Sequence, residues 1–187
     1  MTPKIVGLFF ANLVLAAGMM AAAEASPTVL VGVAKIDITP ELPIRLSGYQ
    51  SRATEAGRVE TRLSARALAI GSDREKPVVL ITVELIGVGE TTSEAVAAAL
   101  LRTHGIERSR VAICATHVHT GPALADVLPF MFSKDLPAEE TERIARYTAE
   151  LRLKLVRLAE TALADRRPGR LAWGEGRADF ATQRRTI

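Results

Sequence analysis

The stretch Arg110-Val-Ala-Ile-Cys-Ala-Thr-His-Val-His-Thr-Gly-Pro122 joins an apolar segment to two histidines and a Gly-Pro turn. The branched apolar residues in 111–115 predict a buried β-strand. The chain has three histidines, and two of them, His117 and His119, follow directly after that strand. In α/β folds the loops that follow buried strands commonly carry the chemistry. The stretch therefore predicts an α/β sheet and the place of a site on it.

The spacing of the two histidines allows two interpretations. Side chains two positions apart in a strand point the same way, so we expect both imidazoles on one side of the strand end. Such a pair can bind a divalent metal, or it can supply one metal ligand and one proton donor. The same spacing also occurs in histidines that are only solvated or hydrogen-bonded, and spacing alone does not decide between the two.

Strands are expected upstream of this stretch. Residues 29–38, VLVGVAKIDI, are rich in branched apolar side chains and predict a strand, whereas residues 47–61 are polar and glycine-containing and predict a loop. Residues 66–70 and 77–85 predict two strands joined by a Gly-Ser-Asp turn. The second of these is nearly all apolar, which is typical of a central strand.

A helix is expected between the second hairpin strand and the histidine strand. Thr91 and Glu94 have the spacing of a capping box, residues 95–101 favour helix, and Gly105 is placed to end it. Cys114, the only cysteine, lies in the apolar strand, so we expect a buried side chain and no internal disulfide.

The longest helix is predicted at 139–164. Its apolar residues recur at steps of three and four and predict one buried stripe: Ile144, Tyr147, Leu151, Leu155 and Leu158. Arg166 and Arg167 are expected to decorate the solvated end of this helix. Residues 170–176, RLAWGEG, predict a last strand.

The first residues resemble a signal peptide. Lys4 precedes an apolar run over 5–23, and Ala23-Glu24-Ala25 offers a cleavage site between small residues. We therefore expect residues 1–25 to be removed and the product to be exported, either to the periplasm or out of the cell. An uncleaved membrane anchor is the alternative, because the run approaches spanning length.

Composition excludes one class of partner. The net charge is +3, acidic and basic residues are interspersed, and no basic stripe interleaved with aromatic residues is visible. The sequence therefore does not predict a nucleic-acid interface. It also gives no indication of an obligate protein partner.

Taken in order, five segments resemble the amino-terminal domain of the neutral/alkaline non-lysosomal ceramidase family. They are GVAKIDITP at 32–40, LSGY at 46–49, RLSARALAI at 62–70, the apolar strand at 78–84, and ATHVHTGP at 115–122. The resemblance implies an α/β fold, a mixed sheet with flanking helices, in which residues 26–187 form the incomplete amino-terminal part of a larger catalytic domain.

The resemblance also implies an activity. Family members are zinc amidases that split the N-acyl bond of ceramide into a sphingoid base and a fatty acid, so a ceramide-like lipid is the expected substrate, with peripheral membrane contact. It assigns His117 as a zinc ligand and places His119 near the reacting carbonyl. Arg184 matches an arginine that faces the substrate, although Gln183 stands where the family commonly has Asn. Zinc suits this chemistry because it polarises an amide carbonyl and activates water.

The resemblance also implies that the zinc site in this chain is incomplete. The family's other ligands, a second histidine, a glutamate and a tyrosine, lie further along than Ile187, as does its catalytic serine. His104 lies beside Gly105 at a predicted helix end and is not expected to bind metal. Glu84 stands where we expect Asp. We therefore expect this polypeptide alone to bind zinc weakly and to hydrolyse little or no ceramide.

Two other classes of protein remain as alternatives to a ceramidase-like enzyme. Amidohydrolase barrels carry His-x-His on their first strand, whereas about three strands precede it here, and a metallo-β-lactamase would need further Asp and His in place of Gly121 and Pro122. The other rival is an exported non-catalytic domain whose loops at 47–61 and 130–137 grip a lipid or a glycan.

Overall fold

The computed structural model describes residues 28–132 and 135–180. Its elements, in chain order, are β1 (Val29–Asp37), β2 (Ser64–Ile70), β3 (Val78–Val83), α1 (Glu90–His104), a 3-10 turn (Arg108–Arg110), β4 (Val111–Ala115), α2 (Ala138–Ala164) and β5 (Arg167–Gly169). The predicted strands at 29–38, 66–70, 77–85 and 111–115 are confirmed, with bounds that differ by a few residues. The signal peptide predicted at 1–25 lies outside the described residues.

The described strands form one five-stranded sheet in the order β4-β3-β2-β1-β5. β1, β2 and β3 pair antiparallel, as does β5 on β1, whereas β4 pairs parallel with β3. The sheet is therefore mixed and the expected α/β class is confirmed. Since it is an open sheet, it is not the barrel that an amidohydrolase would require.

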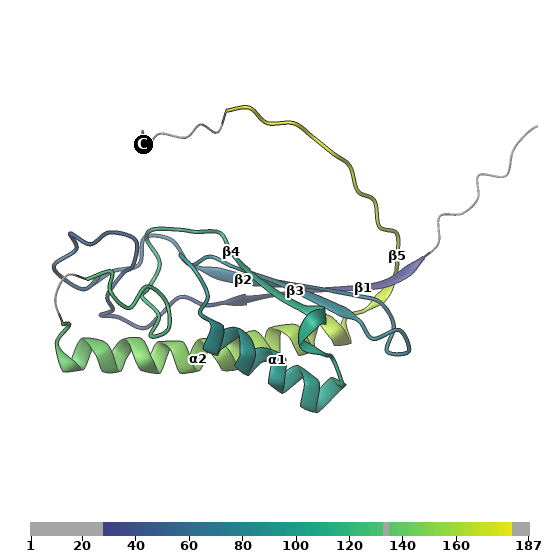
Figure 1. Ribbon diagram of the computed structural model, residues 1–187, viewed down its shortest axis with the longest axis horizontal. Coiled ribbons are helices and arrows are strands. Elements are labelled where there is room, and N and C mark those ends of the chain that lie inside the picture. Colours follow the sequence, from purple (N-terminus) through teal and green to yellow (C-terminus); the bar gives the residue numbers. More distant parts are fainter. Residues whose placement is uncertain (1–27, 133–134, 181–187) are drawn as a thin grey trace, which may run out of the picture.

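Both helices pack on the same face of the sheet (Figure 1). Strand alternation puts small or branched side chains on that face, and they are almost fully buried: Ala65, Ala67, Ala69, Val79, Ile81 and Val83. The stripe predicted for the long helix is also buried, from Ile144 to Leu158. Tyr147 within it donates a hydrogen bond of 2.7 Å to the carbonyl of Ile38, and its burial raises the pKa of the phenol far above the ordinary value.

α2 lies very close to β1 at one point. A Cβ atom on Gly32 would come within 2.1 Å of the carbonyl oxygen of Ala162, so only glycine fits where the helix crosses the strand. This explains why β1 contains a glycine, although glycine in the interior of a strand weakens it.

The start of α1 differs from the expectation. Gly105 ends the helix in the left-handed conformation, as predicted. The predicted capping box is wrong, because the helix begins at Glu90 after Gly89 and Glu94 pairs with Arg108 instead. The cap is supplied from outside the helix by Asp126, whose Oδ2 accepts hydrogen bonds from the Thr92 N–H at 2.9 Å and from two threonine hydroxyls.

The face of the sheet opposite the helices is not covered by any described element (Figure 1). A row of apolar side chains crosses four strands on this face, at Val33, Leu68, Leu80 and Ala112. Val33 is 60% exposed. Cys114 lies on the same face and is exposed, so its predicted burial is wrong: alternation on β4 turns it away from the helices.

The end of the chain also differs from the expectation. The last strand is Arg167–Gly169, which pairs with β1, and the strand predicted at 170–176 is wrong. Residues 170–180 run on as an extended segment above the uncovered face (Figure 1). Arg166 is not a solvated cap, because its guanidinium is largely buried and binds the carbonyls of Leu163 and Gly71.

Within residues 28–132 and 135–180, no helix is both long and apolar enough to pass through a bilayer.

Candidate functional site

The parallel pairing of β3 and β4 positions the histidine loop. Beyond the strand ends, the Thr116 N–H donates to the Val83 carbonyl at 3.0 Å and the Val118 N–H donates to that of Leu85 at 3.2 Å. The two chains therefore stay side by side as they leave the sheet. This holds the loop that carries His117 and His119 against residues 83–86.

His117 is oriented by a hydrogen bond from its own ring. Its Nδ1 lies 2.8 Å from the carbonyl oxygen of Ile86. A carbonyl oxygen can only accept, so Nδ1 carries a proton, and in the neutral ring Nε2 then keeps a free lone pair. The residue adopts a left-handed backbone, with φ of 60°, which turns the chain as the loop begins.

The two imidazoles lie together, with ring centroids 4.9 Å apart and ring planes at 74°. Their closeness agrees with the prediction, but the reason differs. β4 ends at Ala115, and the left-handed backbone at His117 breaks the alternation that the prediction assumed. Loop geometry, rather than a shared strand face, brings the rings together.

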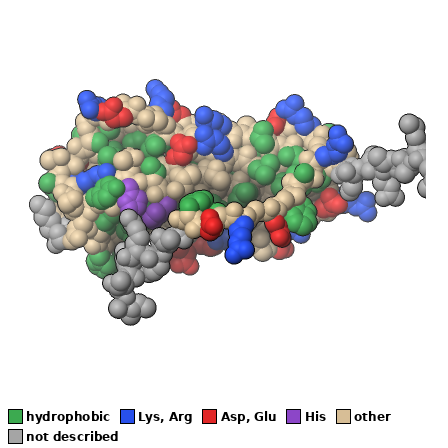
Figure 2. Space-filling view, turned by 90° about the horizontal axis from the view of Figure 1, so that it is seen from above, with side chains coloured by type: hydrophobic (Ala, Val, Ile, Leu, Met, Phe, Trp, Pro, Cys, Tyr) green, Lys and Arg blue, Asp and Glu red, His purple; other side chains and the backbone are tan. Residues whose placement is uncertain are grey.

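Both histidines line an open depression of about 640 Å³. Its other walls come from three segments: Gly48 and Gln50, Ile86, and Leu128 to Met131. Figure 2, which views the uncovered side of the sheet, shows histidine side chains in purple beside hydrophobic side chains in green near one end of the molecule. Phe130 is 92% exposed, so much of the apolar surface here faces solvent. The depression thus combines imidazole nitrogens with an apolar wall.

Sequence reasoning missed three residues around His119. Gly48 has φ of 100°, and a Cβ atom there would lie 2.6 Å from the Cβ of His119. Tyr49 packs its ring against the imidazole, with centroids 5.2 Å apart at 71°. Arg52 donates from Nη1 to the His119 carbonyl at 2.7 Å. The sequence signal for two of them was the motif LSGY at 46–49, which contributed to the family resemblance but to whose residues no function was assigned.

A comparison with protein families matches residues 29–185 to "Neutral/alkaline non-lysosomal ceramidase, N-terminal". The chain belongs to this family. The match includes the histidine loop and the segment around Gly48, so the residues that line the depression lie within the matched region.

Solved ceramidases have a similar fold. "Ceramidase complexed with C2" matches with a TM-score of 0.60 and 23% identity over 76% of this chain. Neutral ceramidase from Pseudomonas aeruginosa matches with a TM-score of 0.58 and 25% identity over the same share. This chain spans 22% of the length of each. Among curated proteins, none matches significantly.

Two other ionisable residues lie apart from His117 and His119. Glu84, which stands where we expected Asp, accepts hydrogen bonds from Arg66 at 2.9 Å and from the Ser64 N–H at 2.8 Å. These contacts, the one from Arg66 first, hold the pKa of Glu84 below its ordinary value. His104 sits at the end of α1, with Nε2 3.8 Å from Glu160, away from the other histidines. Both side chains are used in contacts between elements.

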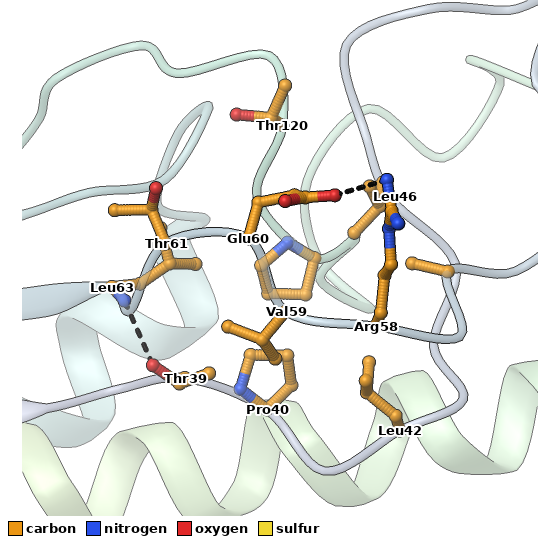
Figure 3. A pocket seen from close by; sticks show the side chains of 12 residues that line it. Thr39, Pro40, Leu42, Leu46, Arg58, Val59, Glu60, Thr61, Leu63 and Thr120 are labelled. Atoms are coloured by element: carbon orange, nitrogen blue, oxygen red, sulfur yellow. Dashed lines mark hydrogen bonds and ion pairs between the residues drawn. The ribbon is translucent and has the colours of Figure 1, made fainter.

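A second hollow shares the 120–122 segment with the histidine loop (Figure 3). Its volume is about 270 Å³, and Leu42, Leu46, Val59 and Leu63 are among its apolar walls. Thr39 accepts a hydrogen bond from the Leu63 N–H across its floor. Arg58 and Glu60 form an ion pair at its rim.

A complete metal centre is not formed by the residues that the structure describes: no group of three or more His, Cys, Asp or Glu is placed to hold an ion there. His117 and His119 are brought together. Arg184 and its neighbour Gln183 lie outside the described residues, so the structure does not place the arginine that the resemblance assigned to the substrate.

Proposed function

We propose that this chain is part of a zinc-dependent amide hydrolase that cleaves the N-acyl bond of a ceramide-like lipid. Membership of the ceramidase family supports the substrate class. The observation that carries the proposal is the hydrogen bond from His117 Nδ1 to the Ile86 carbonyl.

That hydrogen bond prepares His117 as a metal ligand. Histidines that bind metals almost always donate their other ring N–H to a carboxylate, a backbone carbonyl or water. The Ile86 carbonyl fixes the ring orientation and leaves Nε2 as the atom that would bind the metal. Since the His117 side chain borders an open depression, an ion could reach that nitrogen from solvent.

His117 alone cannot hold zinc with the affinity that catalysis needs. Catalytic zinc usually takes about three protein ligands and a water. The described residues add only His119, so further ligands would come from outside them. When bound, zinc would polarise the amide carbonyl and lower the pKa of a bound water to about 7.

The other residues of the depression would act on the substrate. His119 could donate a proton to the developing oxyanion or to the leaving amine, as general acids do within hydrogen-bond reach. Arg184, if it approaches the site as the resemblance implies, would stabilise negative charge. Leu128 and Phe130 offer exposed apolar surface to the hydrocarbon chains of the lipid.

Zinc titration by isothermal calorimetry tests the proposed role of His117. We expect weak binding by the full chain, loss of that binding in His117→Ala, and no change in the control His104→Ala, because His104 lies on α1. Zinc binding that survives His117→Ala would contradict the proposal. Tight stoichiometric zinc binding together with fatty-acid release from ceramide would contradict the expectation that this chain is inactive alone.

A non-catalytic domain that binds a lipid is the second candidate. Leu128 is 49% exposed and Phe130 is 92% exposed beside the depression, which suits a hydrophobic ligand without any reaction. Binding of a fluorescent ceramide to His117→Ala separates the two. If lipid binding and metal content are both unchanged in that variant, the second candidate is correct.

A further inference from the structure

We propose that Arg52 and Tyr49 are positioning residues that hold the imidazole of His119 toward the depression. The role of His119 in a reaction rests on the proposed function above. The positioning itself rests only on contacts within this chain and can be tested without any activity.

Arg52 ties two loop segments together through one nitrogen. Its Nη1 donates to the carbonyl of His119 at 2.7 Å and also to the carbonyl of Ser47. Ser47 is itself paired with the histidine loop, because its N–H donates to the Gly121 carbonyl at 2.9 Å. A guanidinium that bridges two carbonyls in this way fixes the backbone of His119 relative to 47–49.

Tyr49 completes a closed set of contacts around the same histidine. The guanidinium of Arg52 lies 4.8 Å from the centroid of the Tyr49 ring, and that ring meets the imidazole edge to face at 5.2 Å. Arg52 therefore holds both the backbone of His119 and the ring that packs on its side chain. Among the described residues no hydrogen bond reaches the His119 ring, so packing against Tyr49 and His117 is what orients it.

These contacts are anchored in the core of the molecule. Arg45 is only 3% exposed and donates from Nη1 to the carbonyl of Arg52 at 3.1 Å. The same guanidinium binds Glu140, in the first turn of α2, at 2.8 Å through Nε. A chain of contacts thus runs from the long helix through Arg45 and Arg52 to His119.

The exposure of Tyr49 argues that its ring is there for His119 and not for the core. The side chain is 53% exposed, so its burial contributes little to folding. Gly48 beside it lacks the Cβ that would collide with His119, which permits the close approach. The arrangement thus fixes a ring at the wall of a depression and adds little to the core.

Nuclear magnetic resonance of the full chain with labelled histidine tests this proposal. We expect a cross-relaxation contact between the Tyr49 and His119 rings. Tyr49→Leu should abolish the ring contact and change the chemical shifts of His119. Tyr49→Phe should keep the wild-type chemical shifts, because the aromatic ring is still present. Arg52→Ala should weaken the contact, and Arg52→Lys should restore only part of it, because lysine lacks the planar fork.

Arg58→Ala is the matched control, since Arg58 is an exposed arginine of the same loop region and forms an ion pair with Glu60. Arg58→Ala should leave the His119 resonances unchanged. Unmoved His104 resonances verify that each variant is folded. If Arg52→Ala does not fold, the comparison of Tyr49→Leu with Tyr49→Phe still decides. His119 resonances that are the same in wild type, Tyr49→Leu and every folded Arg52 variant would overturn the proposal.

The outcome is separable from that of the proposed function. Zinc titration reports on His117, whereas the ring contact reports on His119. If zinc binding is indifferent to His117→Ala while the Tyr49 contact behaves as expected, the metal hydrolase fails and the positioning stands. The reverse result would leave the hydrolase and remove Arg52 and Tyr49 from it.

Discussion

Gly48 and His119 lie so close that a single added carbon would not fit between them: a Cβ atom at Gly48 would be 2.6 Å from the Cβ and 2.7 Å from the Cα of His119. Gly48 also has φ of 100°, in the region that side chains disfavour. The segment around 48 and the histidine loop are thus fitted to each other by the absence of a side chain.

Gly48→Ala is expected to displace His119 and to lower the free energy of unfolding by about 1–3 kcal/mol, because it adds both a collision and an unfavourable backbone. Urea denaturation measures the loss. Gly57→Ala is the control, since a Cβ atom there would have nothing within 4 Å. Equal stabilities for the two variants would show that the contact at Gly48 is not tight.

Asp126→Ala should destabilise the fold, because Asp126 caps α1 from a distant loop. Its carboxylate accepts from the Thr92 N–H at 2.9 Å, and Arg152 lies 3.5 Å away. We expect a loss of about 1–2 kcal/mol in urea denaturation. Asp126→Asn keeps an acceptor oxygen and should lose less. The capping role would be refuted if Asn and Ala were equally destabilising and both near zero.

The same carboxylate predicts a pH dependence. Burial opposes its ionisation, but hydrogen bonds from Thr92 and Thr91 outweigh burial and hold the pKa of Asp126 below its ordinary value. A group with a lowered folded-state pKa stabilises the fold above its unfolded pKa of about 3.9, and this stabilisation is lost as pH falls through the lower folded value. Urea denaturation from pH 6 downward should therefore show a shallower decline for Asp126→Asn than for wild type.

Tyr147→Phe should cost about 1–2 kcal/mol, because it leaves the Ile38 carbonyl without its donor in the core. Ile38 is fully buried, so water cannot replace the hydroxyl. The matched control Tyr49→Phe removes an exposed hydroxyl and should change the free energy of unfolding little. A Tyr147→Phe variant as stable as wild type would show that this hydrogen bond adds nothing.

Val33→Lys tests the uncovered face of the sheet. Val33 is 60% exposed on that face, so lysine there should not reduce the free energy of unfolding appreciably and should reduce self-association. Analytical ultracentrifugation measures the association. Val79→Lys, on the face covered by the helices, is the contrasting variant and should unfold the chain. Loss of folding in Val33→Lys would mean that this face is buried in solution.

Periodicity predicted the elements that bury a face. The apolar run at 78–83 and the stripe from Ile144 to Leu158 gave the central strand and the long helix because burial there repeats with the period of the backbone. Predictions failed where a residue far away in the sequence determines how a helix begins or where a strand lies. Asp126, 34 residues from Thr92, replaces the local capping box. The last strand is set by pairing with β1 at 167–169, which no local pattern at 170–176 could show.

The site was predictable as a location but not as a geometry. An apolar strand followed by His117 and His119 was enough to place both imidazoles after β4. The tautomer-fixing carbonyl of Ile86 and the Tyr49 and Arg52 contacts come from segments 31 and about 70 residues away in the chain, and only the folded backbone brings them to the loop.

Because β3 and β4 are parallel, the loops at 84–89 and 116–122 lie at one edge of the sheet and the turn at 105–110 lies at the opposite edge. The carboxyl ends of both strands lie at the edge of the sheet that carries the imidazoles. After β3 the chain runs back along α1, and the turn at 105–110 leads into β4 from the opposite edge of the sheet. Insertions and deletions at that far end would leave the distance between Ile86 and His117 untouched. We therefore expect sequence changes and inserted tags to be tolerated better at the exposed residues 107–109 than at 84–89 and 116–122. Ile106 is fully buried and Gly105 ends α1, so these two positions are restricted as well.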